Sequence, residues 1–121
     1  MKYIDTGFLH ITILDDKTVL VAAINGIEID DEKSKYTNDL IQSEMQGSYG
    51  MIVDRTADYS IVPADVYRNL NNNKKLKAIA VVVNNKINFL PIELEKKFYS
   101  NQLEVFKSIK DAYQWLTEIV N

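Results

Sequence analysis

Residues 78–83 form an unbroken run of six apolar residues, AIAVVV, which constrains the fold more than any other feature of this sequence. Lys77 precedes the run, and the polar stretch 84–86 follows it. Six residues are too few for a stable isolated helix, whereas an unbroken run rich in β-branched residues is typical of a strand buried on both faces. Strands of this kind lie in parallel sheets that are covered by helices on both sides. The run therefore predicts an α/β domain, and 121 residues are enough for a single one.

The periodicity of the remaining sequence predicts strands and helices that alternate along the chain. Two β-rich runs, 8–14 and 18–24, flank a short polar turn and predict an antiparallel hairpin. The first run alternates apolar and polar residues, so we expect it at an edge of the sheet. The later strands are predicted at 50–54, 77–83 and 103–106, and the helices at 31–46, from Pro63, from Asn88 and at 110–120. The resulting order, ββαβαβαβα, predicts a mixed, mainly parallel, five-stranded sheet with about four helices.

The apolar residues of the last two predicted helices recur on one side of each helix. Leu90, Leu94 and Phe98 share one side of the helix that begins near Asn88. In the last helix, Ala112, Leu116 and Ile119 recur at helical spacing, with Trp115 at the border of that stripe. We expect the stripe of the last helix to pack on the sheet.

Composition excludes several classes of chemistry. The chain contains no cysteine, which excludes disulfides, thiolate nucleophiles and cysteine-ligated metals. His10 is the only histidine, so a catalytic triad or a multi-histidine metal site has one imidazole at most, and we expect a half-buried strand residue there. No glycine-rich phosphate-binding motif is present, and no cofactor is expected. The sequence predicts a protein that is not an enzyme.

Charge is distributed unevenly along the chain. The net charge is −3, which argues against general nucleic-acid binding. Residues 1–60 carry 11 acids and 5 bases, whereas residues 61–121 carry 6 acids and 9 bases. This split fits either a solvated surface whose halves attract each other, or a bipolar molecule that docks on a charged partner. The longest apolar runs are six residues, too short to span a bilayer, so an integral membrane segment is not expected and a cytoplasmic location is.

The pattern resembles the SpoIIAA-like, or STAS-type, fold, and most of all the small stand-alone STAS/SEC14-like proteins. The resemblance rests on the opening hairpin, GMIVD at 50–54, AIAVVV at 78–83 and VFKSIKDAYQWL at 105–116. In those proteins a Phe, a helix cap, an Ala and a Trp-Leu pair commonly finish the chain, as Phe106, Ser108, Ala112, Trp115 and Leu116 do here. The resemblance implies a single SpoIIAA-like domain over residues 1–121 and a regulatory or protein-interaction role.

The resemblance also marks a difference from the signalling members of that family. Anti-anti-sigma factors carry an Asp-Ser-Ser/Thr segment after the third strand, where a partner kinase phosphorylates one hydroxyl. The matching region after Asp54 reads RTADYSIVPADV, and Pro63 and Ala64 stand about where the hydroxyls belong. The phosphorylation switch is therefore not implied for this chain.

The loop after Asp54 is nevertheless the candidate binding site. Ligands and partners of open α/β sheets gather outside the carboxyl ends of parallel strands. The candidate residues are Asp54, Arg55, Asp58, Tyr59 and Ser60. We expect a protein partner there, with a homodimer left open. The structural alternative is that Asp54 caps a turn or pairs with Arg55.

Two other functions are weighed against this one. The first is the binding of a small apolar or lipid-like ligand between helices and sheet, suggested by Tyr36, Met45, Phe89, Phe98 and Tyr99. The second is a phosphoacceptor receiver domain, which would use the acids at 15–16, Asp54 and Lys107. A strand follows the acid pair where a receiver needs a helix, which argues against the receiver.

Overall fold

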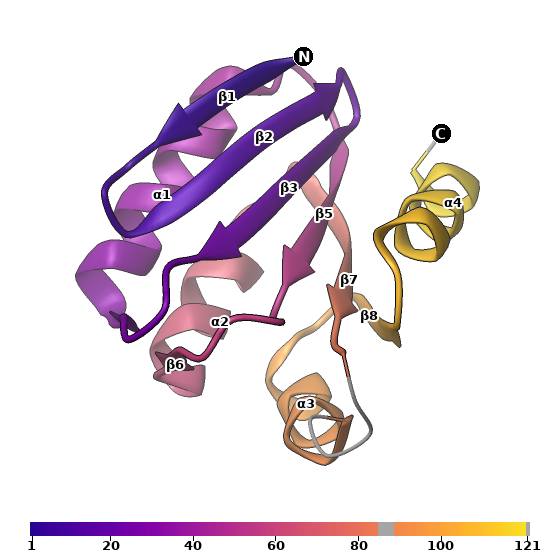
Figure 1. Cartoon of the computed structure of the whole chain (residues 1–121). Helices are drawn as coiled ribbons and strands as arrows, with labels where there is room; N and C mark the ends of the chain where they lie inside the picture. Colours follow the sequence, from indigo (N-terminus) through magenta and orange to yellow (C-terminus); the bar gives the residue numbers. More distant parts are fainter. Residues whose placement is uncertain (85–88, 121) are drawn as a thin grey trace.

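The computed structural model of this chain describes residues 1–84 and 89–120, and it has the alternating architecture that the sequence predicts (Figure 1). The strands are β1 (Lys2–Asp5), β2 (Leu9–Asp15), β3 (Thr18–Ala23), β4 (Glu28–Ile29), β5 (Tyr49–Asp54), β6 (Ser60–Ile61), β7 (Leu76–Val82) and β8 (Gln102–Phe106). The helices are α1 (Asp31–Glu44), α2 (Pro63–Asn71), α3 (Phe89–Glu95) and α4 (Ile109–Ile119), and the 3-10 turn η2 (Lys96–Phe98) extends α3. The predicted α/β class is confirmed.

The main sheet has the strand order β1-β2-β3-β5-β7-β8. The β1-β2 and β2-β3 pairs are antiparallel, and the other three pairs are parallel. The described sheet has six strands where the sequence predicted five, because the four-residue β1 was missed. Since β1 pairs with β2, the prediction that the first hairpin strand lies at the edge is wrong. A separate pair, β4 with β6, lies beside the main sheet.

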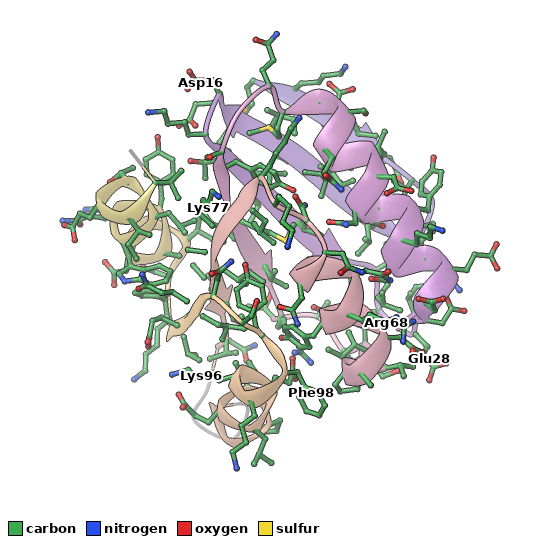
Figure 2. All side chains as sticks on the ribbon, turned by 180° about the vertical axis from the view of Figure 1, so that it is seen from behind. Asp16, Glu28, Arg68, Lys77, Lys96 and Phe98 are labelled. Carbon is green, nitrogen blue, oxygen red and sulfur yellow. The ribbon has the colours of Figure 1, made fainter. Side chains whose placement is uncertain are left out.

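The helices cover the two faces of the sheet unequally. One hydrophobic core lies between the sheet and α1, α2 and α3, and a smaller one lies under α4. Figure 2, seen from behind, shows α1 and α2 in front of the sheet. Residues 78–83 at β7 are all buried, and alternate residues enter the two cores, so the strand is buried on both faces as predicted.

Helix α4 packs on the sheet through the stripe that the sequence identifies. Ala112 and Leu116 are fully buried, while Ile119 and Trp115 are partly buried against the same core. A Cβ atom at Gly50 would lie 2.7 Å from Cδ2 of Leu116, so this glycine lets the helix approach β5 closely. Dispersion and burial at this contact hold α4 in place.

Helix α3 does not bury the apolar residues that share one side of it in the sequence pattern. Leu94 and Phe98, which share one side of the predicted helix, are 60% and 46% exposed, whereas Ile92 and Glu95 are buried. The predicted cap Asn88 lies outside the described residues, and so does the side chain of Leu90. A buried carboxylate needs charged or hydrogen-bonding partners. Glu95 has both, as its contacts in the site show, while Leu94 stays exposed and Phe98, 46% exposed, stacks on the ring of Tyr67.

Candidate functional site

A hollow of about 340 Å³ lies at the carboxyl ends of β5 and β7. Its lining residues come from the loop after β5, from the end of β7 and from the beginning of α3: Arg55, Thr56, Ala57, Asp58, Tyr59, Asn84, Pro91 and Ile92. This is the edge of the sheet at which the sequence places a binding site. Three of the five candidate residues, Arg55, Asp58 and Tyr59, line the hollow.

Asp54 shapes the loop rather than lining the hollow. It is the last residue of β5, and its Oδ1 accepts hydrogen bonds from the backbone N of Thr56 at 3.0 Å and from Thr56 Oγ1 at 2.7 Å. These bonds close a tight turn directly after the strand. Asp54 therefore caps a turn, which is the first of the two structural alternatives given for it. The second, a pairing of Asp54 with Arg55, is not formed.

Arg55 forms a buried ion pair with Glu95 of α3. Its Nη1 donates to both carboxylate oxygens of Glu95 at 2.7 Å, and the two side chains are only 17% and 7% exposed. The Tyr67 hydroxyl donates to Glu95 Oε1 at 2.7 Å. Burial opposes the charge of Arg55, but the nearby Tyr59 and Glu95 prevail and raise its pKa. The pair joins the loop to α3, and Glu95 cancels the charge that Arg55 would bring to the hollow.

Tyr59 lies against the guanidinium group of Arg55 and is partly buried. The Arg55 guanidinium carbon is 5.5 Å from the centre of the Tyr59 ring, within cation–π distance. Burial raises the pKa of Tyr59 to about 12, although the charge of Arg55 opposes this rise. The ring also packs against the larger core. Tyr59 therefore combines a structural role with a position in the wall of the hollow.

Asp58 and Ser60 are both exposed, but they differ in position. The Asp58 backbone is anchored, because its N donates to Asn25 Oδ1 at 2.8 Å and its carbonyl accepts from the N of Gly26 at 2.7 Å. No hydrogen bond or ion pair engages its carboxylate within the described part of the chain. Ser60 belongs to β6, pairs with Glu28 of β4 and does not line the hollow.

Glu95 and Tyr67 were not predicted as site residues. Nothing in the local sequence distinguishes Glu95 from the other acids of its helix, which would be expected on the surface. Its burial depends on Arg55, which lies 40 residues away in the sequence. The one available signal was that Arg55 follows a buried strand, where a cation needs a partner.

A second, apolar crevice of about 90 Å³ lies between the sheet, α1 and α2. Its lining includes Val21, Met51, Val53, Ile61, Val66 and Tyr59, so Tyr59 contributes to both spaces. The residues named for a lipid-like ligand do not gather here. Tyr36 and Phe98 are 55% and 46% exposed, Met45 and Tyr99 are buried elsewhere in the core, and the side chain of Phe89 lies outside the described residues.

The remaining candidates do not form sites. The acids at 15–16 adjoin the beginning of β3, which pairs with the beginning of β5, whereas Asp54 pairs with Ala22 at the other end of both strands. The receiver arrangement is therefore not formed. His10 is exposed, not half-buried as expected, and its Nδ1 lies 2.8 Å from the Tyr3 hydroxyl. Among the described residues, no group of three His, Asp or Glu side chains could hold a metal.

Comparison with known proteins bears on the fold. No family model and no curated protein matches the sequence. One similar crystal structure is that of an uncharacterized protein of the DUF3478 family from Shewanella loihica PV-4, described as having a SpoIIAA-like fold. The match has a TM-score of 0.64 and covers 89% of this chain and 91% of that chain, at 16% identity. This chain therefore has a SpoIIAA-like fold, as its resemblance to that fold implies.

Proposed function

We propose that this protein is a non-enzymatic regulatory module that binds a protein partner at the hollow beside the loop after β5. The observation that carries the proposal is the Asp58 carboxylate, which pairs with no described residue and stands on an anchored backbone in the lining of that hollow. Loops that a rigid scaffold holds at the carboxyl ends of parallel strands commonly contain the residues that bind ligands or partners.

The charges of the hollow indicate the chemistry of the partner. Arg55 is neutralised by Glu95, so it offers little net charge to a ligand. Asp58 contributes an acidic group that no described residue neutralises. The partner is therefore expected to present a Lys or Arg side chain to Asp58, beside Thr56 and Tyr59 in the lining of the hollow.

The anchoring of the loop supports a constitutive surface. Asp54 and Thr56 hold the first turn, the bonds of Asp58 to Asn25 and Gly26 hold the middle, and the Arg55 ion pair holds the base. A loop fixed in this way loses little conformational entropy on binding. It also needs no phosphate to order it, which agrees with the absence of the switch hydroxyls at Pro63 and Ala64.

Site-directed photo-crosslinking in the host cell tests this proposal. A photoreactive amino acid at position 58, and separately at position 56, should capture the same protein. The control is position 16, an exposed acid at the opposite end of β3 (Figure 2). A protein captured from position 16 but from neither loop position would contradict the proposal.

The binding of a small apolar or lipid-like ligand is a second candidate. The apolar crevice under Tyr59 favours it, but a volume of about 90 Å³ is below the roughly 300 Å³ of ordinary ligand pockets. A ligand would have to displace Tyr59 and enter between α1, α2 and the sheet. Native mass spectrometry of protein purified from its host would detect the adduct, and Val66→Trp, which fills the crevice, should remove it.

A further inference from the structure

Asn25 is the one asparagine of this sequence that is followed by a glycine. In an Asn-Gly pair the backbone N of the glycine can attack the side-chain Cγ of the asparagine, because glycine has no Cβ to hinder the approach. Asn25 and Gly26 are both exposed, in the connection between β3 and β4. A Cβ atom built on Gly26 would meet no heavy atom within 4 Å beyond its chain neighbours. The surroundings of the pair therefore leave room for this reaction.

The fold holds both reacting groups of the pair on the backbone of Asp58. Asn25 Oδ1 accepts a hydrogen bond from the N of Asp58 at 2.8 Å, and the N of Gly26 donates to the carbonyl of Asp58 at 2.7 Å. While these two bonds are formed, the N of Gly26 keeps its proton and is engaged with Asp58. The reaction therefore requires that the loop after β5 first separates from Asn25 and Gly26.

The structure next to this contact is small, which favours local opening. The adjoining pair of β4 and β6 has two residues in each strand, and the first residues of both strands, Glu28 and Ser60, are exposed. Two-stranded pairs are only marginally stable in water on their own. Segments with solvent-exposed backbone hydrogen bonds open more easily than core strands. The contact with Asp58 is therefore expected to open in the folded protein, without global unfolding.

We propose that Asn25 is a modification site, at which spontaneous conversion to isoaspartate releases the part of the loop that contains Asp58. The N of Gly26 loses its proton to the solvent and forms a bond to Cγ of Asn25. The bond from Cγ to the side-chain nitrogen breaks, and this nitrogen takes up a proton and leaves as ammonia. Water then opens the resulting cyclic imide at either carbonyl, which gives aspartate or isoaspartate.

The two products differ in their effect on the contact with Asp58. Aspartate keeps a side-chain oxygen that can accept from the N of Asp58. Isoaspartate routes the main chain through the former side chain, which adds a methylene group between residue 25 and Gly26. The oxygen and the N–H group then no longer match the N–H and carbonyl groups of Asp58, so the loop cannot close again. A resulting loss of partner affinity rests on the proposed function, whereas the modification and the release of the loop do not.

Ageing of the purified protein at mildly alkaline pH and physiological temperature tests the modification. Peptide mass spectrometry should find the conversion of amide to acid at Asn25, and an isoaspartate-specific methyltransferase should label the product. The controls are the Asn25→Gln variant and the exposed Gln46-Gly47 pair of the native chain. Neither should convert in the same time, because glutamine must form a larger ring. In guanidinium chloride, conversion at Asn25 should be at least about tenfold faster, since the two protecting hydrogen bonds are absent.

Amide hydrogen exchange, followed by nuclear magnetic resonance on the aged protein, tests the release of the loop. The N–H groups of Asp58 and Ser60 should exchange at least about tenfold faster in the isoaspartate form. The N–H group of Thr56 should exchange as before, because it is bonded to Asp54. Absence of isoaspartate at position 25 in the folded protein, equal rates of conversion in folded and unfolded protein, or unchanged exchange at Asp58 would each overturn the proposal. Release of the loop without loss of the crosslinked partner would support the modification site and count against the proposed function alone.

Discussion

Replacing Arg55 by Leu should destabilise the fold far more than the loss of an ordinary salt bridge. The variant leaves the Glu95 carboxylate, 7% exposed, with the Tyr67 hydroxyl as its remaining partner. Removing one member of a buried ion pair typically costs about 3–5 kcal/mol, because an uncompensated charge stays buried. We therefore expect a loss of about 3–5 kcal/mol in the free energy of unfolding.

Urea denaturation, followed by circular dichroism, measures this loss from the transition midpoint at an unchanged slope. The matched control is Lys2→Ala, which breaks an ion pair with Glu44 whose side chains are 59% and 24% exposed, and which should cost no more than about 1 kcal/mol. Replacing Arg55 and Glu95 together by Leu should recover at least half of the loss, since an apolar pair leaves no buried charge. An Arg55→Leu loss no larger than that of the control would refute the reasoning.

Three further outcomes follow from the packing and the charges. Leu116→Ala should cost roughly 2–5 kcal/mol by urea denaturation, and Gly50→Ala about 1–3, with the double variant losing less than the sum because the two sites touch. Partial burial opposes the charge of Asp15, but the hydrogen bond from Tyr113 helps to keep the pKa of Asp15 below the ordinary 3.8. Tyr113→Phe removes this hydrogen bond and should lower the free energy of unfolding. The loss should be largest above pH 3.8 and should shrink as the pH falls through the lowered pKa of Asp15. Acetyl phosphate with magnesium should leave the mass of the protein unchanged, because Asp54 lies at the opposite end of the strands from the acid pair; a gain of one phosphate would restore the receiver hypothesis.

Hydrophobic periodicity was enough to predict the elements that pack against the sheet directly. The run at 78–83 is buried on both faces, and the stripe of Ala112 and Leu116 faces the sheet, because both patterns are set by local spacing and apolar burial. The strand β1 was missed since four residues of mixed polarity give no periodic signal. Its addition changes β2 from an edge strand to an interior one.

The orientation of α3 could not be predicted from the same rules. Leu94 and Phe98 share one side of the helix in the sequence pattern but stay exposed in part, whereas the cation of Arg55 provides a partner for Glu95 inside the molecule. The candidate loop, too, could be predicted only in part. Its place at the carboxyl end of β5 followed from topology, whereas the burial of Tyr59 against Arg55 depends on tertiary contacts.

The most direct test of the account is the affinity of the Asp58→Lys variant for the protein captured by crosslinking from position 58. Asp58 is exposed, its carboxylate has no partner in the described residues, and its replacement should leave the unfolding midpoint unchanged. Titration calorimetry with the purified partner should show an affinity at least about tenfold weaker, because a lysine would oppose the basic group of the partner. The matched variant Asp16→Lys should bind like the wild type. Equal affinities for all three proteins would contradict the assignment of partner binding to this hollow.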